Sequence, residues 1–155
     1  PKNNYYVYGN KRNTKISISK KSENNLYLND YIPYKNISKI LLNMDLLLMP
    51  YTSSITVAGD VGDITKFTSP LKLFDYLCVG RPIICSNFNV LKEIITNNKN
   101  AIFVKNYKNA FAWRKEITKL FNNREKMKII FKNNYNLSKK YSHITRASKI
   151  LDLVK

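Results

Sequence analysis

The chain has 155 residues, of which 44% are hydrophobic and 12% aromatic. Such a chain buries roughly 70% of its unfolded surface in one compact domain, which argues against disorder. Twenty-seven Lys and Arg residues against ten Asp and Glu give a net charge of +17. This charge attracts phosphates, anionic lipid headgroups or nucleic acid. The alternative is a surface that carries lysine only because the whole sequence is rich in Asn, Lys, Ile and Tyr.

The two cysteines, Cys78 and Cys85, lie within apolar runs. We interpret both as small buried hydrophobes and not as a disulfide or a metal site, which fits a reducing compartment. We expect no signal peptide, and the apolar runs are much shorter than the roughly 18 residues that span a membrane. A cytoplasmic protein is therefore expected.

Apolar runs bounded by turn residues predict short buried strands separated by helices. The predicted strands are 5–8, 25–28, 45–50, 82–86 and 100–105, and the predicted helices are 36–44, 69–79, 89–95, 109–121, 124–141 and from 145 onward. The segment 10–25 reads equally well as a strand or a short helix. The long loop 51–67 contains Asp60 and Asp63, which do not make a convincing metal site, and it has the length of a loop that closes over a ligand.

This order of elements predicts an α/β fold. Wholly apolar strands alternating with helices indicate a parallel sheet with helices on both faces, in a Rossmann-like three-layer α/β/α arrangement. We expect one such domain over residues 1–155. In these sheets, ligands bind outside the carboxyl ends of the strands.

The stretch "TSPLKLFDYLCVG" draws attention to the helix 69–79. Ser69 is a good N-cap and Pro70 suits the first helical position. The free amides at this end would attract a phosphate, Lys72 would add a positive charge, and Asp75 lies at a distance that suits a sugar hydroxyl. The alternative is an ordinary helix start in which Asp75 pairs with Lys72 three residues earlier.

The segment "SPLKLFDYLCVGRPIICSNFNVLKEII", between "MDLLLMPY" and "NAIFV", resembles the C-terminal half of family 4 glycosyltransferases. The tail "NLSKKYSHITRASKIL" resembles the closing pattern of the same family. Similarity covers about residues 5–153. It implies the C-terminal, nucleotide-sugar-binding half of a two-domain GT-B fold.

The resemblance implies roles for individual residues. Thr68 and Ser69 would hold the donor diphosphate, with Lys72 nearby, and Asp75 would bind the ribose hydroxyls. Asp75 is one methylene shorter than the usual glutamate. The family's other glutamate falls at Phe67, which cannot hydrogen-bond the donor sugar, and we interpret this as a feature of one branch of the family.

Tyr31 and Ile32 match the connector whose backbone contacts the nucleotide base in the family. Glu93 is interpreted as structural. His143, the single histidine, replaces the family's usual tryptophan, so a packing or surface role is expected.

The resemblance further implies a glycosyltransferase that transfers a sugar from a nucleoside diphosphate sugar with retention of the anomer. No metal or other cofactor is expected. The acceptor would be a glycan or a lipid-linked sugar, in the synthesis of cell-envelope polysaccharide or glycoconjugates. We expect the chain to be a piece that lacks the N-terminal acceptor domain, the first strand and its basic pair, and to be inactive alone.

The basic charge suggests a peripheral location at the inner face of an anionic membrane, through lysines between Lys115 and Lys140. Two alternatives remain open: a nucleic-acid-binding or membrane-binding domain without catalysis, and half of a nucleotide-sugar epimerase. Nucleic acid ranks low because the chain contains no recognition motif and its basic residues are spread through every element.

Overall fold

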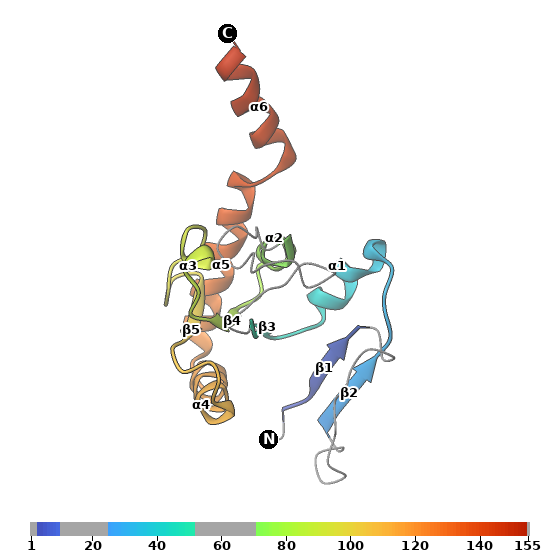
Figure 1. Ribbon diagram of the computed structural model, residues 1–155, viewed down its shortest axis with the longest axis vertical. Coiled ribbons are helices and arrows are strands. Elements are labelled where there is room, and N and C mark those ends of the chain that lie inside the picture. The colour runs from blue at the N-terminus through green and yellow to red at the C-terminus, as the bar shows by residue number, and fades with distance from the viewer. Residues whose placement is uncertain (1–2, 10–24, 52–70, 155) are drawn as a thin grey trace, which may run out of the picture. The chain divides into compact units, whose positions relative to one another are not determined.

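The computed structural model describes residues 3–9, 25–51 and 71–154. The chain divides into two compact units, residues 1–40 and residues 41–155. The described strands form two separate parallel sheets, one in each unit (Figure 1).

The first unit contains a two-stranded parallel sheet. β1 (Tyr5–Tyr8) pairs with β2 (Leu26–Asn29), with Tyr5 opposite Leu26. The rings of Tyr6 and Tyr27 stack with their centroids 4.8 Å apart, as expected for aromatic residues at paired positions on one face of a sheet. The strands predicted at 5–8 and 25–28 are therefore confirmed. α1 (Tyr34–Leu42) follows β2 and continues across the boundary between the units.

The second unit is built on a three-stranded parallel sheet in the order β3–β4–β5. Its strands are β3 (Leu47–Met49), β4 (Ile83–Ser86) and β5 (Ala101–Val104). Every residue of β4 and β5 is buried. This explains why these strands read as continuous apolar runs in the sequence, since a parallel sheet is covered on both faces.

The described part of the second unit also contains five helices. They are α2 (Leu71–Cys78), α3 (Asn89–Lys92), α4 (Ala110–Phe121), α5 (Arg124–Lys140) and α6 (His143–Val154). α2 packs against α5, α4 packs against β5 and α5, and α6 contacts α5. Leu73 and Leu77 of α2 and Ile130 of α5 are completely buried.

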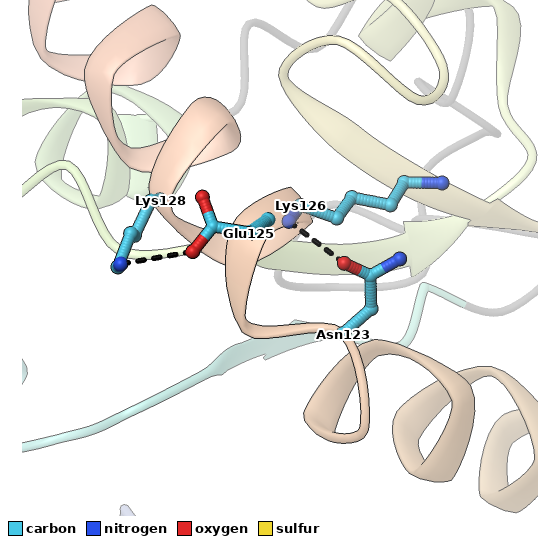
Figure 2. A network of polar contacts seen from close by, with 4 residues as sticks. All are labelled: Asn123, Glu125, Lys126 and Lys128. Carbon is cyan, nitrogen blue, oxygen red and sulfur yellow. Dashed lines mark hydrogen bonds and ion pairs between the residues drawn. The ribbon is translucent and has the colours of Figure 1, made fainter.

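Asparagine side chains cap the amphipathic helices α4 and α5. Asn109 Oδ1 accepts a hydrogen bond from the Phe111 amide at the start of α4, at 2.8 Å. Asn123 Oδ1 accepts from the Lys126 amide at the start of α5, at 2.9 Å (Figure 2). Each cap satisfies one of the amides that the first turn of a helix leaves without an internal partner.

Two details differ from the sequence-based predictions. α3 ends at Lys92, whereas a helix over 89–95 was predicted. The chain must turn toward β5 here, through Asn98, whose φ of 62° is left-handed and whose amide donates to the Ala101 carbonyl. The prediction that both cysteines are buried is wrong for Cys78, which is exposed. Cys78 follows the buried Leu77 and is therefore rotated about 100° away from the buried face of α2.

The predicted stop of α2 at Gly80 is confirmed. Gly80 has a φ of +71°, and its amide donates to the Leu77 carbonyl at 3.0 Å. A residue in this left-handed conformation ends many helices, and glycine adopts it without steric cost. A Cβ atom at Gly80 would lie only 3.0 Å from Cε2 of Phe131 on α5, so glycine also allows close packing between α2 and α5.

Candidate functional site

The carboxyl ends of three parallel strands meet at one edge of the second unit's sheet. β3 ends at Met49, β4 at Ser86 and β5 at Val104. The Ser86 hydroxyl is completely buried and donates to the carbonyl of Tyr51 at 2.7 Å, which ties the ends of β3 and β4 together. This edge is where α/β sheets of this kind bind ligands.

A row of aromatic rings follows the strand ends. The Tyr51 and Phe88 rings meet edge to face with centroids 6.4 Å apart, and the Phe88 and Tyr107 rings lie 5.2 Å apart. The Trp113 indole of α4 donates to the Tyr107 carbonyl at 2.8 Å and holds that segment in place. No sequence motif predicted this row of rings. The available signal was positional, because each ring belongs to the first aromatic residue after its strand.

α2 positions two of the predicted site residues, Lys72 and Asp75. Because α2 connects β3 to the parallel strand β4, its first turn lies toward the carboxyl edge of the sheet. The fully buried Leu73 and Leu77 fix the rotation of the helix. Lys72 is left exposed and Asp75 half-buried.

The charge of Asp75 acts on two neighbouring side chains. The pKa of Tyr76 is raised to about 12, first by burial and then by Tyr51 and Asp75. The pKa of the Cys78 thiol is also raised, first by burial and then by Asp75. The Tyr76 hydroxyl reaches the Leu48 carbonyl at 3.5 Å. Asp75 thus lies close to a tyrosine that is itself held against β3.

The other predicted site residues are distributed differently. Thr68 and Ser69 lie outside the described residues, as do Phe67, Asp60 and Asp63. Their predicted roles therefore stay predictions.

Tyr31 and Ile32 belong to the first unit, between β2 and α1. Tyr31 is 75% exposed and Ile32 is half-buried. Both follow the carboxyl end of β2, which is the position that the sequence analysis predicted for a connector.

A shallow hollow of about 290 Å³ lies beside β5 and α3. Its walls come from the segment after β4, the turn before β5 and the end of β5, with Phe103 as an apolar part of the lining and Lys92 and Lys105 as its charged members. Neither Lys72 nor Asp75 is among the described residues that line this hollow.

Residues 3–9, 25–51 and 71–154 contain no group of three or more His, Cys, Asp and Glu side chains that could hold a metal ion. Within these ranges, no helix is both long and apolar enough to cross a membrane.

Residues 1–137 match the family model described as "Glycosyl transferases group 1". The chain belongs to this family. The match includes both sheets, α2 and most of α5, and it agrees with the resemblance on which the site residues were assigned.

Solved structures of one protein from Anabaena share the fold. Anabaena Alr3699/HepE in complex with UDP superposes with a TM-score of 0.68 at 13% sequence identity. Its complexes with UDP-glucose, and with UDP and glucose, give TM-scores of 0.65 and 0.66 at 14% identity. In each case 85% of this chain is covered, against 32% of the Anabaena chain. The chain therefore spans about a third of the length of these structures. The superpositions confirm the GT-B α/β fold that the sequence predicted. No curated protein gave a significant match.

Proposed function

We propose that this group 1 domain binds the nucleotide of a nucleoside diphosphate sugar at the carboxyl edge of its sheet. In this proposal the amides at the start of α2, with Thr68, Ser69 and Lys72, hold the diphosphate, and Asp75 accepts hydrogen bonds from the ribose hydroxyls. The observation that carries the proposal is the family match over residues 1–137, combined with the position of α2 between β3 and β4.

The geometry of α2 suits this role. The positive end of a helix dipole stabilises an anion, and here the first described turn lies toward the ligand-binding edge. A carboxylate such as Asp75 accepts two hydroxyl hydrogen bonds well, and charge-assisted bonds of this kind contribute about 1.5 to 3 kcal/mol each. The half-buried setting of Asp75 leaves it partly accessible from solvent.

The reaction that follows from this site is glycosyl transfer from the bound donor. As the bond from the sugar to the diphosphate breaks, negative charge develops on the departing phosphate, and the helix amides and Lys72 stabilise that charge. No metal is required for this stabilisation. We further propose a family 4 enzyme that retains the anomer and acts on a glycan or lipid-linked acceptor in polysaccharide or glycoconjugate synthesis. This proposal includes a second domain that binds the acceptor.

UDP is the first nucleotide to test, because the structurally similar Anabaena protein was solved with UDP and with UDP-glucose. Isothermal titration of the intact protein with UDP, GDP and ADP should show selective binding of one diphosphate. Equal binding of all three nucleotides that disappears at moderate salt would indicate a general polyanion surface and would contradict the proposal.

Titration with the nucleoside, its monophosphate and its diphosphate distinguishes the proposed roles of Lys72 and Asp75. With the preferred base, Lys72→Ala should weaken binding of the diphosphate roughly tenfold and leave the nucleoside unchanged, because only the diphosphate meets the ammonium charge. Asp75→Ala should weaken nucleoside, monophosphate and diphosphate alike, because all three contain the ribose. The reverse pattern would show that the two residues are wrongly assigned.

A further inference from the structure

α5 exposes a line of basic side chains on one face. Positions separated by three or four residues lie on the same side of a helix, and this spacing is kept along most of α5. We define the α5 stripe as the exposed residues Arg124, Lys128, Lys132, Tyr135 and Lys139. The stripe is about 22 Å long, at 1.5 Å per residue. The other side of the helix is anchored in the core by the completely buried Ile130 and Asn134.

Aromatic and aliphatic side chains accompany the cations of the stripe. Tyr135 is 49% exposed and lies within the stripe, with the Lys139 ammonium 4.7 Å from the centre of its ring. Ile129 and Phe131 flank the stripe on its two sides and are 57% and 43% exposed. The exposed apolar side chains beside these lysines make a surface that is both positively charged and hydrophobic. Exposed hydrophobic groups that cluster in this way indicate a binding surface.

Negative charge on α5 is scarce. The helix contains six basic residues and one acidic residue, Glu125. The Glu125 carboxylate accepts a hydrogen bond from the Lys128 ammonium at 2.9 Å (Figure 2), but both side chains are about three-quarters exposed, so this ion pair is weak and easily exchanged. The stripe therefore retains most of its positive field, in a chain whose net charge is +17.

We propose that the α5 stripe docks the protein on an anionic lipid surface. An anionic bilayer offers both partners that this face requires: phosphate charges for the lysines, and an interfacial layer that accepts tyrosine, phenylalanine and isoleucine side chains. A nucleic-acid backbone would satisfy the charges but leave Ile129 without an apolar partner. The docking is peripheral, with α5 lying along the surface while its opposite side remains packed in the domain.

The test uses the intact protein and sedimentation with vesicles of phosphatidylcholine, with or without about one third phosphatidylglycerol. Binding is expected with the anionic vesicles and should fall as salt is raised. Each basic residue near such a surface contributes roughly a fivefold gain in binding. The double variant Lys128→Gln/Lys132→Gln should therefore bind about 30-fold more weakly.

A matched control removes the same charge from another helix. Lys115 and Lys119 are exposed on α4, and Lys115→Gln/Lys119→Gln should weaken vesicle binding by no more than about threefold. Equal losses for the two double variants would show that bulk charge and not the α5 stripe drives binding, which would overturn the proposal. Equal binding to neutral and anionic vesicles would overturn it as well.

The apolar component separates a membrane from a nucleic acid. Ile129→Ser keeps the charge and the helix, and it should reduce binding to anionic vesicles roughly fivefold, because a half-exposed aliphatic side chain no longer enters the interface. Vesicle binding that is unaffected by Ile129→Ser, together with tighter binding to a double-stranded DNA fragment, would assign the stripe to nucleic acid instead. Circular dichroism confirms that each variant is folded.

Discussion

Replacing Gly80 with alanine tests how α2 is joined to the rest of the second unit. Gly80 has a φ of +71°, where a residue with a Cβ atom is strained by about 1 kcal/mol. The added Cβ would also meet Cε2 of Phe131 at 3.0 Å and Cδ2 at 3.2 Å. Moving this ring by a few tenths of an ångström costs about another 1 kcal/mol. We therefore expect Gly80→Ala to lower the free energy of unfolding by about 2 kcal/mol.

The steric part of this loss is measurable separately. Phe131→Leu removes the ring atoms that the new methyl group would meet, and the ring is 43% exposed, so this substitution by itself should be mild. In the Phe131→Leu background, the cost of Gly80→Ala should fall to about 1 kcal/mol, the backbone contribution alone. The coupling free energy between the two sites is therefore expected to be about 1 kcal/mol.

Urea and thermal unfolding of the four proteins in this cycle provide the measurement. For a domain of this size, about 2 kcal/mol corresponds to a decrease in Tm of roughly 4 to 8 °C. A loss below about 0.5 kcal/mol for Gly80→Ala would refute the left-handed conformation at this position. A full loss that is the same with and without the Phe131 ring would refute the close contact between α2 and α5.

Two further predictions concern single polar groups. In the native protein, alkylation followed by mass spectrometry should modify the exposed Cys78 and leave the buried Cys85 intact, and modification of both thiols without unfolding would contradict the burial of Cys85. Burial also raises the pKa of the Cys85 thiol, so the unfolding free energy should fall as pH rises above about 9, where the thiol of the unfolded chain ionises first. Asn134→Ala should lower the free energy of unfolding by about 1 to 2 kcal/mol in chemical denaturation, because the buried side-chain amide donates to the Arg81 carbonyl, just before β4, at 3.1 Å. Asn136→Ala, on the exposed side of α5, should change it very little, and equal effects of the two substitutions would argue against the buried hydrogen bond.

The second unit was largely predictable from local sequence patterns. Its strands are continuous apolar runs because both faces of the sheet are covered, and α2 ends at a glycine because the stop requires a left-handed residue. The end of α3 was not predictable in the same way. The segment 93–95 continues the apolar pattern of a helix, but the turn through Asn98 toward β5 takes precedence over it. The requirement to connect α3 to β5 thus overrides the helical pattern of the local sequence.

The candidate site was predictable only in part, because its members come from different elements. Lys72 and Asp75 were identified within one helix, where spacing along the chain determines which side chains share a face. The row formed by Tyr51, Phe88 and Tyr107 depends on the pairing order β3–β4–β5, which no single segment of the sequence encodes. The exposure of Cys78 was not predictable for a similar reason, since an apolar run does not reveal which side of a short helix faces the core.

The most direct test of the proposed donor site compares two aspartates by titration of the intact protein with UDP. Asp75 lies on α2, whereas Asp45 is exposed just before β3, at the opposite edge of the sheet. Asp75→Ala should weaken binding by about 2 to 3 kcal/mol, roughly 30- to 150-fold, through loss of the bonds to the ribose, while Asp45→Ala should bind like the parent protein. Unchanged affinity in a folded Asp75→Ala variant, or equal losses in both variants, would contradict the account.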